Sequence, residues 1–139
     1  MVSHVAWDDA YKVGHEMIDS QHRRLFELAD VLFCLLGTDA EQDRSHVEAV
    51  ILDCAEYVLF HFSNEERLMD EIGYDQAEHH LKLHHDFNGY VSKLIGDFTD
   101  GKDIDLGKLY SYLANWLVQH IITEDKKLAE YIANSQQMV

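Results

Sequence analysis

A histidine and a glutamate stand four residues apart in the segment His61–Glu65, which reads HFSNE. Residues four apart on an α-helix lie about 40° apart around its axis, so the two side chains would point in the same direction. The apolar residues around them repeat with the same helical period, which places both side chains on the buried face. A buried carboxylate without a partner is costly, so this pair needs partners from elsewhere in the chain.

Further histidines stand on the apolar stripe of every other amphipathic segment. They are His22, His80, His84 and His120, and Asp125 follows His120 by five residues. Taken singly, each signal is weak, because HxxxE and HxxxH pairs arise often by chance and a lone core histidine usually finds a hydrogen-bond partner. Taken together, five inward histidines with an inward glutamate would destabilise a core that left them unpaired.

Metal coordination would satisfy such a set, because neutral imidazoles and carboxylates become ligands. With Asp125 the set numbers seven, which is more than a tetrahedral zinc ion accepts. Two octahedral ions that share bridging carboxylates would use all of them. The remaining histidines are interpreted as surface residues: His4, His15, His46, His79 and His85.

Four amphipathic segments must position these residues. We expect helices over residues of about 19–36, 41–71, 76–98 and 105–133. Asp19 or Ser20 is the expected N-cap of the first helix, and turn residues follow each segment. Helices joined by short loops predict an all-α fold, an antiparallel up-down-up-down four-helix bundle. Residues 1–18 are expected to form an irregular N-terminal arm, and residues 134–137 a polar tail.

Length and composition limit the class of protein. The 139 residues predict a single domain, residues 1–139, with a proper core. The formal net charge of −15 argues against nucleic acid or an anionic membrane as a partner, since both are polyanions. We expect neither a signal peptide nor a membrane span, because no apolar stretch has the required length or flanks. The two cysteines lie in different predicted helices, so we expect no disulfide and a cytoplasmic location.

The chain resembles the hemerythrins, and the bacterial hemerythrins in particular. The resemblance covers essentially the whole chain and rests on four stretches: Ile18–His22 (IDSQH), His61–Glu66 (HFSNEE), His80–His84 (HLKLH) with Phe87, and Trp116–Asp125 (WLVQHIITED). It implies a four-helix bundle that holds two non-haem iron ions. One departure, Asp75 where many family members have proline, lies in a loop and affects no ligand.

The resemblance also assigns the ligands. It implies one iron ion on His80, His84 and His120, a second on His22 and His61, and bridges between them from Glu65, Asp125 and an oxo or hydroxo group. The adjacent His79 and His85 offer a shifted register for the third helix. We prefer the first pair because it lies on the apolar stripe and keeps Phe87 in its family position.

The function implied by the resemblance is reversible binding of dioxygen at the di-iron centre, for oxygen sensing or for oxygen carriage and storage. The domain would stand alone or form the sensory module of a longer signalling protein, and the sequence leaves this choice and the oligomeric state open. Di-iron proteins of the ferritin-like class use glutamates in Glu-x-x-His pairs, which this chain lacks. Histidine-rich ligation therefore favours a binding protein over an enzyme. A di-iron enzyme that handles peroxide or nitric oxide is the alternative.

Four apolar residues beside the histidines are candidates for the wall of the dioxygen pocket: Leu25, Phe26, Leu117 and Ile121. Leu117 stands one helical turn before His120, and Leu25 and Phe26 follow His22 by about one turn. Each of the four fits a plain core role equally well. Leu117 is the preferred candidate because its stripe position and the resemblance agree.

The spacing from His120 to Asp125 predicts a local departure from α-helical geometry. Five residues separate side chains by about 140° on a regular α-helix, too far for both to reach one pair of metal ions. We therefore predict a widened π-type turn or a helix end between Ile121 and Asp125. An unbroken α-helical hydrogen-bond ladder through Asp125, with its carboxylate still beside the histidines, would contradict this prediction.

Overall fold

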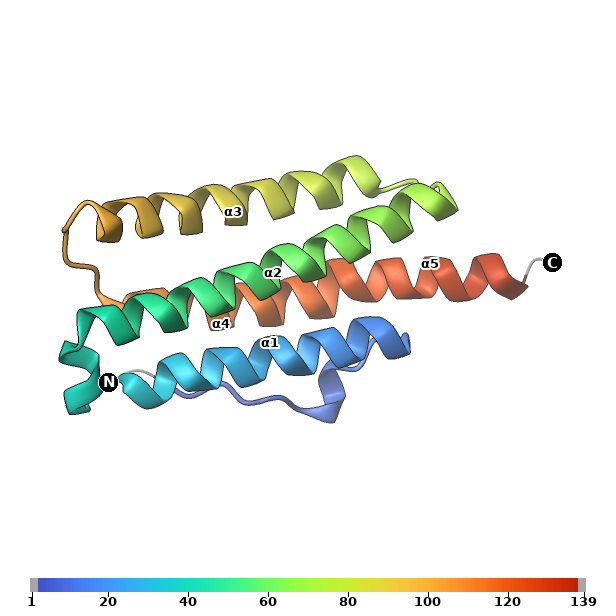
Figure 1. Ribbon diagram of the computed structural model, residues 1–139. Coiled ribbons are helices and arrows are strands. Elements are labelled where there is room, and N and C mark those ends of the chain that lie inside the picture. Colours follow the sequence, from blue (N-terminus) through green and yellow to red (C-terminus); the bar gives the residue numbers. More distant parts are fainter. Residues whose placement is uncertain (1–2, 138–139) are drawn as a thin grey trace.

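A computed structural model describes residues 3–137, which form a bundle of four antiparallel helical rods (Figure 1). The rods are α1 (Glu16–Leu35), α2 (Arg44–Ile72), α3 (Ala77–Thr99), and a long composite of α4 (Leu106–His120), a π-helical turn (Ile121–Asp125) and α5 (Lys126–Gln137). Short 3-10 turns lie at Asp9–Tyr11 and Asp39–Gln42, and no strand occurs within residues 3–137. α1 packs against α2 and α4, and α2 packs against α3. The predicted all-α bundle is confirmed.

α1 begins at Glu16, before the predicted N-cap at Asp19. His15 caps the helix instead, since its Nδ1 accepts a hydrogen bond of 3.3 Å from the backbone N–H of Ile18. Asp19 lies inside the first turn, where its carboxylate accepts hydrogen bonds from the backbone N–H groups of residues 13–14. The predicted start was wrong because the Asp19 carboxylate holds the end of the arm rather than the start of its own helix.

The arm crosses α1 and α4. The backbone N–H of Val5 donates a hydrogen bond of 2.8 Å to the Tyr110 hydroxyl on α4. Trp7 meets the ring of Phe26 edge-on with a centroid distance of 5.7 Å, and Tyr11 stacks on the same ring at 5.6 Å. The arm is therefore fixed over a residue that lies about one turn after His22.

The start of α2 also differs from the prediction, which placed it near Glu41. The 3-10 turn takes up that segment, and the α-helix begins at Arg44. Asp43 provides the N-cap, because its carboxylate accepts a hydrogen bond of 3.2 Å from the backbone N–H of His46.

The fourth rod passes through the π-helical turn Ile121–Asp125, which confirms the predicted departure from α-helical geometry. The wider turn returns Asp125 to the buried face that also carries His120. Beyond it, α5 extends to Gln137, so residues 134–137 continue the helix instead of forming the expected polar tail. Neither glycine nor proline stands there to stop the helix.

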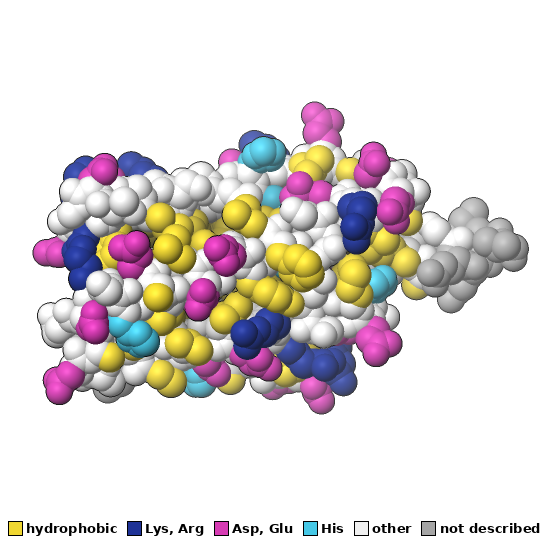
Figure 2. All heavy atoms as spheres, in the orientation of Figure 1, with side chains coloured by type: hydrophobic (Ala, Val, Ile, Leu, Met, Phe, Trp, Pro, Cys, Tyr) yellow, Lys and Arg dark blue, Asp and Glu magenta, His cyan; other side chains and the backbone are white. Residues whose placement is uncertain are grey.

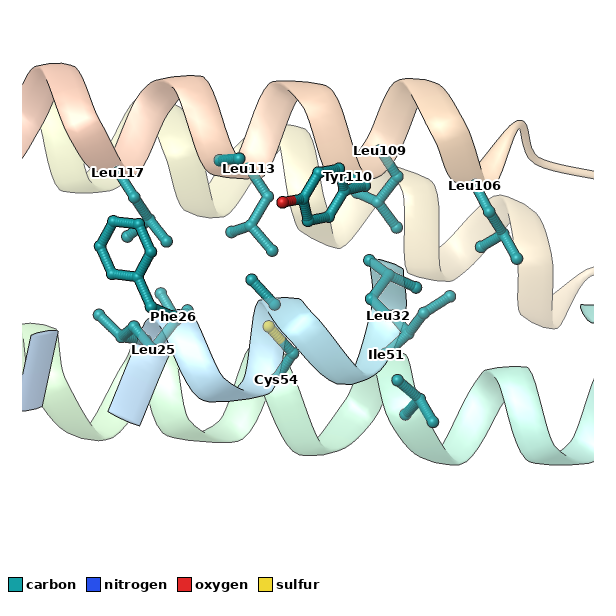
Figure 3. Packing of buried hydrophobic residues seen from close by; sticks show 14 of the residues in the cluster. Leu25, Phe26, Leu32, Ile51, Cys54, Leu106, Leu109, Tyr110, Leu113 and Leu117 are labelled. Atoms are coloured by element: carbon teal, nitrogen blue, oxygen red, sulfur yellow. The ribbon is translucent and has the colours of Figure 1, made fainter. Parts of the chain in front are cut away.

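Two clusters of buried apolar side chains fill the bundle. The main core runs through α1, α2 and α4, with two phenylalanines from α3 (Figure 3). The smaller cluster, here called the end core, consists of Ile18, Met69, Tyr74, Leu128 and Ile132. The inward polar residues lie between the two clusters, since on α1 His22 stands between Ile18 of the end core and Leu25 of the main core.

Acidic side chains are spread over the face shown in Figure 2, with hydrophobic side chains between them. This distribution agrees with the formal net charge of −15. Among the described residues, no helix is both long enough and apolar enough to cross a membrane. Cys34 and Cys54 are free, as expected, and burial raises the pKa of the Cys54 thiol to about 12.

The end of α2 depends on a glycine. Gly73 has a φ of 64°, in the left-handed region, and the next N–H, that of Tyr74, donates to the Met69 carbonyl over 3.0 Å. We predict that Gly73→Ala lowers the free energy of unfolding by about 1 kcal/mol, because an L-residue is strained in this conformation. Urea unfolding followed by circular dichroism measures the change.

Gly89→Ala is the matched control. Gly89 lies exposed inside α3 with ordinary helical backbone, and an added Cβ meets nothing within 4 Å. This substitution should stabilise the protein by about 0.5–1 kcal/mol. Equal stabilities of the two variants would contradict the prediction that a side chain at position 73 strains the backbone.

Candidate metal centre

The seven residues predicted from the sequence converge in the middle of the bundle. They form two groups of potential ligands whose atoms lie within 4.8 Å of one another in each group: Glu65, His80, His84, His120 and Asp125 in the first, and His22, His61, Glu65 and Asp125 in the second. The two carboxylates belong to both groups. All seven side chains are buried, and the most exposed of them, His120, has a relative exposure of only 5%.

Helix geometry accounts for this convergence. α2 supplies His61 and Glu65, and α3 supplies His80 and His84, so each pair stands one helical turn apart on an inward face. α1 supplies one histidine and the fourth rod supplies His120 with Asp125 across the π-helical turn. The neighbours His79 and His85 are exposed, whereas His80 and His84 are buried on the inward face of α3.

Glu65 directs one oxygen to each histidine group. Its Oε1 lies 3.4 Å from Nε2 of both His80 and His84. Its Oε2 lies 3.5 Å from Nε2 of His61 and 3.9 Å from Nε2 of His22. The carboxylate therefore spans the two groups.

Asp125 does the same from the opposite rod. Its Oδ1 lies 3.1 Å from Nε2 of His80 and 3.2 Å from Nε2 of His120, whereas its Oδ2 lies 2.8 Å from Nε2 of His22. Two carboxylates that each face both histidine groups are the arrangement needed to bridge two cations.

Many of these buried atoms lack a hydrogen bond. These atoms have no partner in hydrogen-bonding geometry, although some lie at a short distance from another polar atom. They include both oxygens of Glu65, both oxygens of Asp125 and both nitrogens of His22. In addition, Nε2 of His120 lies 3.0 Å from Nε2 of His80 and 3.2 Å from Nε2 of His84. Converging lone pairs and orphaned carboxylates are stable only with cations among them, so the residues present fit a pair of metal ions.

Without metal ions, bound protons must balance the negative charge of the two carboxylates. Burial lowers the pKa of His80, but the carboxylates of Asp125 and Glu65 outweigh it and raise this pKa to about 10. The pKa of His22 is also raised, because Asp125 overcomes the effect of burial. His61 behaves differently, since burial lowers its pKa to about 4.

The carboxylates stay ionised. Burial and the charge of Asp125 act to raise the pKa of Glu65, yet the surrounding histidines lower it to about 2. The pKa of Asp125 falls well below its ordinary value, because the histidine contacts, led by His120, outweigh burial. The metal-free cluster thus holds two carboxylates against protonated imidazoles.

Several neighbours of the cluster have roles that the sequence did not reveal. Gln21 Oε1 lies 2.7 Å from Nδ1 of His61, and Glu66 Oε2 lies 3.0 Å from Nδ1 of His84. Both occur inside stretches that carry the family resemblance, but their sequence positions gave no sign of a contact with a histidine on another helix. Aromatic rings enclose the first group, because Phe62 stacks on His84 at 3.7 Å and Trp116 stacks on His120 at 4.4 Å.

The four candidate pocket residues are all buried in the main core. Figure 3 shows Leu117 on α4 facing Phe26 and Leu25 on α1. Ile121 opens the π-helical turn directly after His120. Their part in a dioxygen pocket stays a prediction.

Residues 13–132 match the family model described as the Hemerythrin HHE cation binding domain. The chain belongs to the hemerythrin family. This membership implies a non-haem di-iron centre that binds dioxygen.

Relatives and solved structures agree with the family assignment. A bacteriohemerythrin of Pseudomonas paraeruginosa is 32% identical over 136 residues, which cover 96% of this chain and 85% of that protein. Myohemerythrin-1 of Phascolopsis gouldii is 31% identical over 121 residues, which cover 87% of this chain and 88% of that protein. The crystal structure of a wild-type hemerythrin superposes with a TM-score of 0.85 at 25% identity, covering 92% of this chain and 97% of that one.

Metal binding to the hemerythrin centre should release protons. With a pKa of about 10 in the metal-free cluster, His80 is protonated near neutral pH, whereas a metal ligand must be neutral. The affinity for Co²⁺ should therefore rise about tenfold per pH unit for each displaced proton between about pH 6 and pH 8. Titrations followed by Co²⁺ absorption test this, and equal affinities at both ends of that range would contradict it.

The same pKa fixes the sign of a stability effect in the metal-free protein. A raised folded-state pKa means that His80 contributes stability that is complete below its ordinary value of 6.5 and is lost as the pH rises through about 10. Thermal unfolding of metal-free wild-type protein and of His80→Ala, compared along that range, isolates this contribution.

Proposed function

We propose that this protein binds dioxygen reversibly at a non-haem di-iron centre inside the bundle. The observation that carries the proposal is the position of the two carboxylates. Glu65 and Asp125 each turn one oxygen toward the three-histidine group and the other toward the two-histidine group. Such carboxylates are suited to bridge two ions, with an oxo or hydroxo group as the third bridge.

The proposed ligands of one ion are His80, His84 and His120, and those of the other are His22 and His61. Because the second ion has one histidine fewer, it would keep a coordination position for dioxygen. Two ferrous ions at these positions would supply the electrons that reversible dioxygen binding requires. The chain itself would hold the ligands in place and keep water away.

We assign the exclusion of water to buried apolar residues that lie within about one helical turn of His22 or of His120. Leu25, Phe26, Leu117 and Ile121 each expose at most 3% of their surface. A dry apolar wall admits dioxygen, which is apolar, more readily than water or anions. We therefore propose these four as the wall of the dioxygen pocket, with Leu117 as the residue that faces α1.

The biological use of dioxygen binding is proposed as sensing or as carriage and storage, without catalysis, in the cytoplasm. The free thiols of Cys34 and Cys54 support a reducing compartment. The complete reading frame separates the first two uses, since a sensor requires an attached or associated signalling domain. Turnover of peroxide or nitric oxide by the purified protein would favour an enzyme instead.

Iron content tests the centre directly. We expect about two irons per chain after loading with Fe²⁺ without oxygen, and a visible absorption band that appears with dioxygen and fades when it is removed. His61→Ala and Glu65→Ala should lose much of the iron, because each removes a buried ligand. His46→Ala is the matched control on the exposed side of α2, and it should keep all of the iron. A folded wild-type protein that holds one metal or none would refute the proposal.

Leu117→Ala tests the pocket wall. Leu117 exposes only 3% of its surface, so its truncation leaves a cavity and should cost about 2–5 kcal/mol of stability. Easier entry of water and anions should make the dioxygen-loaded variant autoxidise several times faster, with both irons retained. The decay of the dioxygen-dependent absorption band measures the rate.

Leu106→Ala is the control for a general loss of packing. Leu106 lies on the same helix and exposes 7%, but Figure 3 shows it at the opposite end of the main core from Leu117. This variant should lose stability without faster autoxidation. Equal autoxidation rates for wild-type protein and a fully loaded Leu117→Ala variant would remove Leu117 from the pocket.

A further inference from the structure

In two of the inward histidines, Nδ1 lies within hydrogen-bond distance of a side chain on another helix. The two side chains differ in charge. Gln21 Oε1 lies 2.7 Å from Nδ1 of His61, and the Gln21 side chain is buried. Glu66 Oε2 lies 3.0 Å from Nδ1 of His84, and the side chain of Glu66 is 36% exposed. Neither residue belongs to the proposed ligand set.

Both contacts fix which nitrogen faces the centre. An amide carbonyl and a carboxylate oxygen can only accept a hydrogen bond, so Nδ1 of each histidine must carry the proton. Nε2 then keeps its lone pair, and it lies 3.5 Å from Glu65 Oε2 in His61 and 3.4 Å from Glu65 Oε1 in His84. Each outer residue thus turns its histidine into a neutral donor that faces the shared carboxylate.

This support is selective. Nδ1 of His22 and Nδ1 of His80 are buried without any hydrogen-bond partner. Each histidine group therefore contains one member oriented by an outer side chain, His61 in the two-histidine group and His84 in the three-histidine group, beside one whose Nδ1 is unsupported.

The two supporting groups differ in charge. A carboxylate that accepts from Nδ1–H draws the proton toward itself and makes Nε2 a stronger electron donor, whereas a neutral amide does so much less. The carboxylate of Glu66 acts on the three-histidine group, and the amide of Gln21 acts on the two-histidine group.

We propose that Gln21 and Glu66 are the positioning residues of His61 and His84, and that their difference in charge makes the two metal positions electronically unequal. The carboxylate of Glu66 favours the ferric state at the three-histidine position. The amide of Gln21 orients His61 without adding negative charge at the position assigned to dioxygen. The inference rests on the proposed di-iron centre.

Metal affinity tests the role of Gln21. Gln21→Ala removes the acceptor, and it should weaken the binding of one of two Co²⁺ ions by about 10–100-fold. Gln21→Glu restores an acceptor of the same length and should recover the affinity. Gln42→Glu, on an exposed residue of the 3-10 turn, adds the same charge elsewhere and should bind as wild-type protein does.

Reduction potential tests the role of Glu66. Glu66→Gln keeps an acceptor of the same shape but removes the negative charge, so both irons should stay bound while the midpoint potential of the iron pair rises. Glu71→Gln, exposed on the same helix, is the control and should leave the potential unchanged. Spectroelectrochemical titration of the iron-loaded proteins measures these potentials, and a purely structural contact would alter stability alone.

The outcomes separate this inference from the function on which it rests. A wild-type protein that does not bind two metal ions refutes the di-iron proposal. A wild-type protein that binds two, together with Gln21→Ala of equal affinity or with a fully loaded Glu66→Gln variant of equal potential, overturns the inference alone. Recovery in Gln21→Glu together with a raised potential in Glu66→Gln supports it.

Discussion

The burial of two carboxylates in the middle of a helical bundle is the constraint on which the rest of the structure depends. Glu65 and Asp125 expose 0% and 1% of their surface, and burial alone would drive both to neutrality. Imidazoles from α2 and α3 counter this effect at Glu65 and lower its pKa to about 2, and those of His120, His22 and His80 lower the pKa of Asp125. No single helix could supply enough of them, since one inward face offers only one position per turn. The four rods must therefore pack together to surround the two carboxylates.

The backbone adapts to this demand in one place. An unmodified α-helix would carry Asp125 away from the face of His120, and the π-helical turn brings the two side chains together. Elsewhere regular helix suffices, because the pairs of potential ligands on α2 and α3 stand four residues apart. Outside the cluster, Gln21 and Glu66 form hydrogen bonds with His61 and His84. Rigid helices, rather than loops, carry most of the site.

The sequence predicted the parts of the molecule that follow from periodicity. The four apolar stripes, the inward histidines and the π-type turn all depend on angular spacing along one helix. The sequence failed to predict features that depend on partners far away in the sequence or on residues outside the apolar stripe. Asp19 has the chemistry of an N-cap but holds the arm, and Gln21 and Glu66 could not be paired with histidines on other helices because contacts between helices leave no trace in spacing. The convergence of the seven inward residues and the family membership were therefore predictable, whereas the helix starts and the outer hydrogen bonds were not.

The division of the apolar interior into two clusters has a consequence for how the protein moves. The inward polar residues lie between the end core and the main core, and Val13 packs against both clusters. The inward polar residues and Val13 therefore connect the two clusters. Bound iron would make the bundle one folding unit, whereas its loss would leave the end core as a separate unit that opens locally before the rest. Binding or loss of iron would then change the local order at the ends of α2 and α5, without any rearrangement of the main core.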